Sequence, residues 1–269
     1  MQKIIFNLFV VAIICLGGLT PLKAMAGAWT MPAGEGQIIS TFDISQADSF
    51  FSDSSVSDVN FSKQEQRIYY EHGITDKITL VLNGAHQQLN FQSSESALNF
   101  TDFTDIELGA SFQLHRDEQS ALAFQGSYII GGGPPRSIID LDGPEDGAII
   151  RALYGRNHSF SSKTSGFFDL QPALRFREGD GLIGWDSDVT FGVKHGDRFM
   201  VLAQVFHSDR RGEEALGFSV PSSSRTQGKF SLVYRYKGNN RVQLGYQRTV
   251  LGSNILRENT FSIGSWWRY

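Results

Sequence analysis

Of the six histidines, His207 is the best candidate for nucleophilic catalysis. His207 is followed by Asp209, and three serines at 222–224 end the polar segment that comes next. A histidine beside a carboxylate can take the proton of a serine hydroxyl, which is the chemistry of a hydrolase. No His-x-Ser pair occurs, although that spacing would place both side chains on one face of a strand. We therefore expect no enzymatic activity, and a lipid hydrolase in the His207 region is the alternative.

A second group of chemistry-bearing residues is acidic. Asp140, Asp142, Glu145 and Asp146 fall within seven positions, shortly after the sequence GGGPP at 131–135. Clustered carboxylates can hold calcium, which prefers oxygen ligands, but the spacing of an EF-hand loop is absent. The scattered histidines and the one cysteine give no pattern of transition-metal ligands either. We interpret this segment as a solvated acidic loop, with a calcium site as the alternative, and we expect no metal and no other cofactor.

Elsewhere, charged and polar residues alternate with apolar ones. The alternation is most regular over 104–114, where the apolar residues at every second position are Ile106, Leu108, Ala110, Phe112 and Leu114. A period of two indicates a strand with one apolar and one polar face. A strand between lipid and a watery interior has this pattern, and about 9 to 11 residues are enough for it to cross a membrane.

We expect twelve such strands, joined alternately by short turns and longer polar loops. They are placed at 36–46, 61–72, 77–90, 103–115, 119–130, 147–156, 165–177, 184–195, 197–208, 225–236, 240–250 and 257–269. An even number of antiparallel strands, with both ends of the chain on the short-turn side, is typical of bacterial outer-membrane barrels. The predicted fold class is therefore all-β, a single antiparallel transmembrane β-barrel of about 12 strands.

Residues 1–26 have the features of a cleavable secretion signal. Lys3 precedes an apolar run, and Ala24, Met25 and Ala26 form a small-x-small cleavage site. Beyond this segment no apolar run reaches the length of about 18 residues that a membrane-spanning helix needs. We expect a signal peptide at 1–26 and an outer-membrane barrel at 27–269. The formal net charge of −4 argues against a nucleic-acid partner.

The strand period also predicts which charges face the lumen. In the hairpin of 165–177 and 184–195, a register in which opposite position numbers add to 363 brings three acidic residues opposite three basic ones. The pairs of this predicted charge ladder are Asp169 with Lys194, Arg175 with Asp188, and Arg177 with Asp186. The other charges predicted to face the lumen are Asp43, Lys63, Glu65, Arg67, Glu107, Arg151, Lys229, Arg235 and Glu258. Because both signs are present, we expect weak ion selectivity.

Aromatic residues on the opposite, outward face fall near the strand ends. Tyr70, Tyr154, Tyr236, Trp267 and Tyr269 lie toward the predicted short turns. Rings of Tyr and Trp are typical of the two interfaces of a membrane. A secreted β-sandwich, the alternative fold, also has alternating strands, but it buries its apolar face and needs no outward aromatic ring.

Two stretches resemble a known family. GAWTMPAGEGQ (27–37) and YEHGITDKITL (70–80) are similar to the Trp-containing entry and the Tyr-x-x-Gly-x-Thr-Asp turn of outer-membrane transporters of the meta-pathway of phenol degradation family. The resemblance covers only the first third of the chain, and the turn motif recurs in many outer-membrane barrels. It implies a barrel with a transport role and no catalytic or binding residues to carry over. The C-terminus resembles the recognition signal of the barrel-assembly machinery, with Trp267 and Tyr269 after Gly264, and it departs from that signal at Ile263.

These patterns predict a narrow channel or transporter for small solutes in the bacterial outer membrane, with both termini periplasmic. A structural or adhesive barrel that acts through its extracellular loops is the alternative. The expected partners are outer-membrane lipid, a small solute, and the barrel-assembly machinery during biogenesis. We expect a monomer.

Overall fold

The structure is a computed structural model that describes residues 27–51, 58–94, 97–132, 146–215 and 218–269. The predicted signal peptide at 1–26 lies outside these residues, as do three of the four calcium candidates, Asp140, Asp142 and Glu145. No helix in the described part of the chain is long and apolar enough to cross a membrane.

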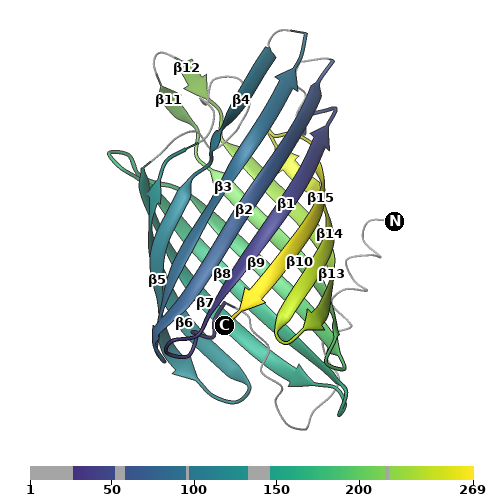
Figure 1. Cartoon of the computed structure of the whole chain (residues 1–269). Helices are drawn as coiled ribbons and strands as arrows, with labels where there is room; N and C mark the ends of the chain where they lie inside the picture. The colour runs from purple at the N-terminus through teal and green to yellow at the C-terminus, as the bar shows by residue number, and fades with distance from the viewer. Residues whose placement is uncertain (1–26, 52–57, 95–96, 133–145, 216–217) are drawn as a thin grey trace.

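Twelve antiparallel strands form a closed barrel (Figure 1). Each strand of the wall pairs with its neighbour in sequence, and the β1–β15 pairing joins the two ends of the chain. The wall strands are β1 (Gly36–Ala47), β2 (Asn60–Thr75), β3 (Ile78–Gln92), β5 (Ile106–Arg116), β6 (Ser120–Ile130), β7 (Gly147–Ser159), β8 (Thr164–Arg177), β9 (Gly181–His195), β10 (Phe199–Arg210), β13 (Ser223–Lys237), β14 (Asn240–Ser253) and β15 (Asn259–Arg268). The predicted fold class is confirmed.

The predicted loop 91–102 contains a strand that was not expected. This strand, β4 (Ala97–Phe103), pairs with the second half of β3, whereas β5, the strand expected at 103–115, pairs with the first half of β3. At the break between them, the Thr104 amide donates to the Ala85 carbonyl at 2.7 Å. The predicted loop 209–224 also contains a small hairpin of β11 (Glu213–Ala215) and β12 (Phe218–Val220).

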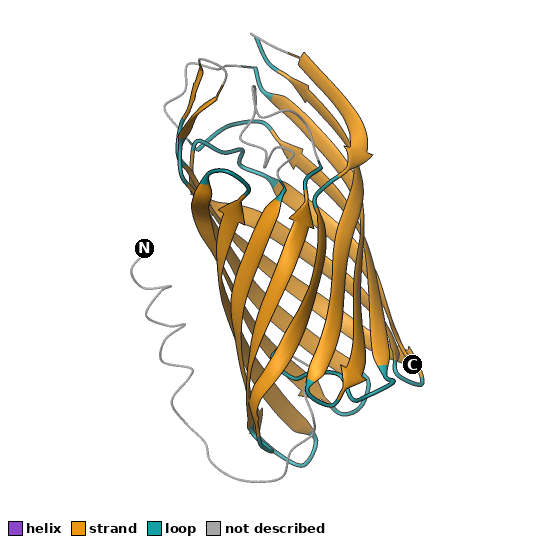
Figure 2. Ribbon diagram, turned by 90° about the vertical axis from the view of Figure 1, so that its left-hand side faces the viewer, coloured by secondary structure: helices purple, strands orange, loops and turns teal. Residues whose placement is uncertain are grey.

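The two ends of the barrel differ. The end where β1 begins and β15 finishes has only short turns. The other end has the longer connections, with β4 and the β11–β12 hairpin, together with the short β8–β9 turn (Figures 1 and 2). We call these the short-turn end and the long-loop end.

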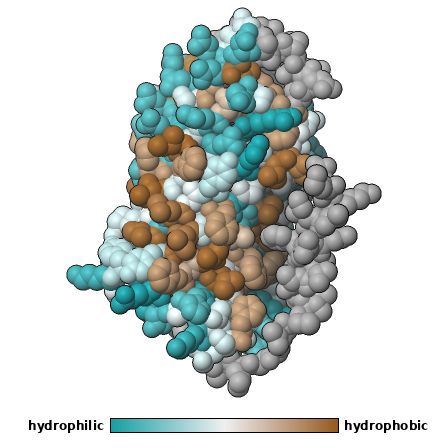
Figure 3. Space-filling model, turned by 90° about the vertical axis from the view of Figure 1, so that its right-hand side faces the viewer, coloured by the Kyte–Doolittle hydropathy of each residue, from teal (hydrophilic) through white to brown (hydrophobic). Residues whose placement is uncertain are grey.

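The outer wall is apolar because the predicted alternation holds in three dimensions. On β15, Phe261 and Ile263 are 66% and 56% exposed, whereas Thr260 and Ser262 are each 6% exposed. Hydrophobic residues gather across the middle of the wall, with hydrophilic ones above and below (Figure 3). Near the short-turn end the hydroxyls of Tyr70 and Tyr269 lie 3.1 Å apart. An exposed apolar surface that surrounds the molecule suits lipid and not water.

The predicted register of the β8–β9 hairpin is wrong. Opposite position numbers add to 359 over most of the pair, so Asp169 lies beside Thr190 rather than Lys194. The reason is the turn, which was expected at 178–183. The actual connection is the three residues 178–180, flanked by Gly181 with a φ of 76°. A short turn of this kind fixes the register of the strands that it joins.

Candidate functional site

The inward faces of the strands enclose two cavities. The larger, of about 600 Å³, begins at Trp29 and Met31 near the short-turn end. The smaller, of about 230 Å³, is lined by Arg210 and Ser223 toward the long-loop end. Residues that line both cavities are Lys63, Glu65, Arg67, Asn83, Glu107 and Arg225. These shared side chains form the passage between the cavities.

Most of the charges predicted to face the lumen line the larger cavity. They are Asp43, Lys63, Glu65, Arg67, Glu107, Arg151, Asp169, Asp188, Lys194, Lys229 and Glu258. Arg175 lines the smaller cavity. The remaining three line neither cavity. Asp186 pairs with Arg175 and Arg210, whereas Arg177 and Arg235 lie at opposite ends of the barrel and pair with Asp180 at 3.0 Å and Asp197 at 3.6 Å. Seven acidic and seven basic side chains line the larger cavity, so its charge is balanced.

Six of these charges alternate in sign around the barrel in strand order. This central charge ring consists of Asp43 on β1, Arg67 on β2, Glu107 on β5, Arg151 on β7, Asp188 on β9 and Lys229 on β13. Electrostatic attraction links Arg67 to Asp43 and Glu107, Asp188 to Arg151, and Lys229 to Asp43. Alternating charges on facing walls create an electric field across the lumen rather than along it.

The side chains of four members of the ring make no hydrogen bond and no ion pair within 4.0 Å to any described residue. They are Asp43, Arg151, Asp188 and Lys229. Asp43 Oδ1 and Arg151 Nε are buried and without a partner among the described atoms. A buried charge is costly when it has no partner, so these groups are available to water or a solute.

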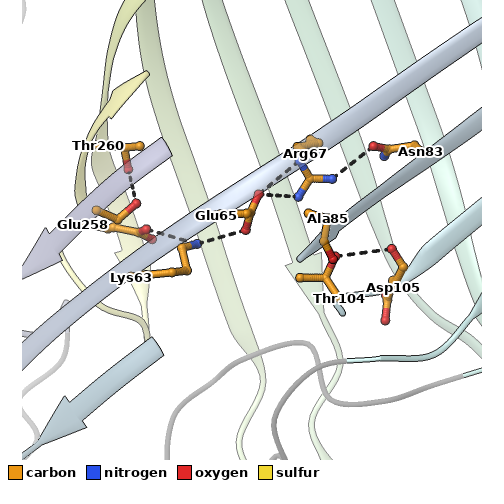
Figure 4. Close-up of polar contacts among 10 residues, drawn as sticks. Lys63, Glu65, Arg67, Asn83, Ala85, Thr104, Asp105, Glu258 and Thr260 are labelled. Carbon is orange, nitrogen blue, oxygen red and sulfur yellow. Dashed lines mark hydrogen bonds and ion pairs between the residues drawn. The ribbon is translucent and has the colours of Figure 1, made fainter. Parts of the chain in front are cut away.

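A chain of polar contacts occupies the passage between the cavities (Figure 4). Lys63 Nζ lies 3.3 Å from Glu258 and 3.6 Å from Glu65. Glu65 in turn accepts from Arg67 Nη2 at 2.8 Å, and Arg67 Nη1 donates to Asn83 at 3.2 Å. These contacts link Glu258, just before β15, to side chains of β2 and β3, so the charges in the passage pair with one another.

The predicted charge ladder is replaced by a different network. Arg175 Nη1 donates to Asp105 at 3.1 Å, and its Nε lies 3.8 Å from Asp186. Asp186 also accepts from Arg210 Nη1 at 2.7 Å. Asp105 accepts from the Gly132 amide at 3.1 Å, so this network connects β8, β9 and β10 to the beginning of a long loop. Asp188, the predicted partner of Arg175, belongs instead to the central charge ring.

The short-turn end of the larger cavity carries an apolar patch that the strand period did not predict, with Lys194 and Arg241 beside it. Trp29 packs against two buried clusters, one on β8, β10 and β13 and the other on β6 and β7. One contains Phe167, Met200, Leu202 and Val233, with Trp266 against it, and the other contains Ala28, Ala121, Ala123 and Leu153. We call the lining side chains Trp29, Phe167, Met200, Leu202 and Trp266 the apolar floor.

Residues 27–35, which precede β1, are bound inside the short-turn end. The Thr30 amide donates to Gln113 Oε1 at 3.1 Å, and the Met31 amide donates to Thr79 Oγ1 at 2.8 Å. The Gly34 amide donates to the Gly73 carbonyl at 2.9 Å, and a Cβ on Gly73 would lie 2.1 Å from the Pro32 carbonyl oxygen. The two stretches that resemble the transporter family are therefore in direct contact with one another.

A signal for this arrangement was present in the sequence. Ala121, Ala123 and Gly155 occupy inward positions, where the other strands carry larger polar residues. A Cβ on Gly155 would lie 2.1 Å from Trp29 Cζ3, so the missing side chain makes room for the indole. Phe167 and Phe168 are a second signal. Phe168 faces outward, so its neighbour Phe167 faces inward, where a polar residue is the rule.

The hydrolase candidate His207 lies on the outer face near the long-loop end. Its Nδ1 is 2.9 Å from Thr226 Oγ1, and its ring packs against Trp185 at a centroid distance of 4.6 Å. No serine hydroxyl contacts the imidazole among the described residues. Of the calcium candidates only Asp146 is described, and its Oδ1 accepts from the Gly131 amide at 2.9 Å. The described residues contain no cluster of three or more His, Cys, Asp or Glu side chains arranged to hold a metal ion.

Solved structures that resemble this barrel include an outer-membrane channel and a porin. The crystal structure of the COG4313 outer membrane channel from Pseudomonas putida F1 matches 92% of this chain and 100% of its own, with a TM-score of 0.69 and 12% identity. The KdgM porin matches 85% of this chain and 98% of its own, with a TM-score of 0.51 and 8% identity. A scan of family models and a search of curated proteins find no match to the sequence. The chain thus shares the β-barrel fold of these two outer-membrane proteins.

Proposed function

We propose that this protein is a narrow outer-membrane channel for small solutes, with weak ion selectivity and no enzymatic activity. The observation that carries the proposal is the charge-balanced lumen of two adjoining cavities inside a lipid-compatible wall. Twelve-stranded barrels lie between eight-stranded ones, which side chains fill, and porins of about 16 strands, which leave an aqueous channel. The passage past Lys63, Glu65 and Arg67 and the bound segment 27–35 restrict the path to small molecules.

Orientation follows from the two ends. In outer-membrane barrels the short turns face the periplasm and the long loops face outward. Both termini of this barrel would then be periplasmic, after a signal peptide at 1–26 has been removed. Trp267 and Tyr269 are 41% and 57% exposed on the outer wall, which supports recognition of the C-terminal strand by the barrel-assembly machinery.

The contact between 27–35 and the β2–β3 turn supports the finer assignment to the transporters of the phenol meta-pathway family. The two stretches that resemble the family, 27–37 and 70–80, bind to each other at the short-turn end of the lumen. Nothing in this contact specifies a solute. The family assignment therefore supports a transport role, and the substrate class must be inferred from the side chains that line the lumen.

Liposome swelling with uncharged sugars of increasing size tests the channel function. Proteoliposomes should swell in pentoses and hexoses and should exclude trisaccharides. Trp29→Ala should accelerate swelling because the indole lies in the floor, whereas Trp267→Ala, on the outer wall, should leave the rate unchanged. Folded protein that gives no swelling with any sugar would contradict the proposal.

A further inference from the structure

The larger cavity has both a charged and an apolar lining. The central charge ring and the apolar floor both line it, and the floor lies toward the short-turn end. On β10, Leu202 in the floor is two residues from Gln204, which lies directly beside Lys229 of the ring. Inward positions two residues apart on a strand are separated by about 7 Å. A molecule of about this length can touch the floor and the ring together.

The ring discriminates by charge distribution rather than by net charge. A monovalent ion inside it is attracted by the residues of one sign and repelled by the interleaved residues of the other. A zwitterion can place each of its charges against an opposite one, and charge-assisted hydrogen bonds to such groups are the strong ones. Asp43 and Lys229 attract one another electrostatically without forming an ion pair within 4.0 Å. This leaves both available to a ligand that carries both signs.

We propose that the lumen binds small zwitterions with an apolar side chain, the chemical class of aromatic and branched aliphatic α-amino acids. The proposal deepens the proposed function, on which it rests. The ligand's ammonium group lies against the Asp43 carboxylate, its carboxylate lies against the Lys229 ammonium, and its side chain lies on the floor formed by Trp29, Leu202 and Trp266. The buried and unpartnered Asp43 Oδ1 gains a hydrogen-bond donor in this complex.

Isothermal titration calorimetry on the detergent-solubilised protein separates the contributions of the two charges. The probes are L-phenylalanine, 3-phenylpropionate, which lacks the amino group, phenethylamine, which lacks the carboxylate, and glycine, which lacks the side chain. L-Phenylalanine should bind about 10- to 150-fold more tightly than either monovalent analogue, the effect of one hydrogen bond to a charged group. Glycine should bind more weakly than L-phenylalanine because it does not reach the floor.

Two variants test the assignment of each charge. Asp43→Asn should abolish the preference for L-phenylalanine over 3-phenylpropionate, and Lys229→Gln should abolish its preference over phenethylamine. Lys237→Gln, an exposed residue near the β13–β14 turn, is the matched control and should change neither ratio. These are ratios within one variant, so a general loss of folding or affinity does not imitate them.

Equal binding of L-phenylalanine and both analogues by the unmodified protein would overturn the inference, as would ratios that stay constant in both variants. Swelling in sugars without discrimination among these ligands would support the proposed channel function and contradict only the proposed substrate class. Discriminating binding without swelling would support the site and contradict the channel.

Discussion

Gly155 makes space for Trp29, and filling that space should loosen the segment at 27–35. In Gly155→Ala the new Cβ would lie 2.1 Å from Trp29 Cζ3, whereas carbon atoms prefer about 3.5 to 4.0 Å. The indole must therefore move by about 1.5 Å, in a site already filled by the apolar floor. Overpacking of this kind costs about 1 to 3 kcal/mol.

The assay is amide hydrogen exchange in the folded barrel. The Thr30, Met31 and Gly34 amides donate to Gln113, Thr79 and Gly73, so they should exchange slowly in the unmodified protein. A cost of about 1 to 3 kcal/mol on the docked segment corresponds to exchange about 5- to 140-fold faster.

Gly126→Ala is the matched control, because a Cβ there meets no atom within 4 Å. It should leave the exchange of 27–35 unchanged. If the two variants exchanged at the same rate over these amides, Trp29 would not be held against Gly155 in the way that we describe.

Three further outcomes follow from the same structure. Leu244→Arg should destabilise the barrel by about 2 to 4 kcal/mol in urea unfolding from lipid vesicles because Leu244 faces the hydrocarbon, whereas Gln247→Arg on the same strand enters the lumen and should cost far less. Arg175→Gln should shift the reversal potential in a salt gradient toward cations, because two carboxylates near the smaller cavity lose this counter-charge. On intact cells, proteases should cut within 209–224 and spare 237–239.

Each of these outcomes has a result that would refute it. Equal loss of stability for both arginine variants on β14 would mean that the strand is assigned inside out. Arg248→Gln, which removes a charge from the exposed outer wall, is the control for the Arg175 variant. An equal shift of the reversal potential in both variants would show that the smaller cavity does not determine ion selectivity. Cleavage confined to the β13–β14 turn would invert the orientation.

The wall of this barrel could be predicted because the alternation of side chains is a local property. Ile263 and Ser262 are assigned to opposite faces by adjacency alone, and the structure places them so. Register is different, since it depends on turn length. The β8–β9 turn is three residues long rather than six, and this moves Asp169 from Lys194 to Thr190.

The interior could be predicted only in part. Inward charges such as Lys229 follow from the strand period, but their partners come from strands far apart in sequence. Arg175, for example, bonds to Asp105, which lies 70 positions away and on another part of the wall. Segment 27–35 has no strand period, so its position could not be predicted from periodicity. It depends on the space that the small residues Gly155 and Ala121 leave on the inner wall.

A channel of this kind must conduct ions once it has folded in a membrane. Single-channel recording in planar bilayers, with heat-modifiable migration on gels as the check of folding, measures this. We expect small discrete current steps and a reversal potential close to zero in a salt gradient, because the acidic and basic side chains of the larger cavity are equal in number. Folded protein that produces no steps, or steps with strong selectivity for one sign of ion, would contradict the charge-balanced channel.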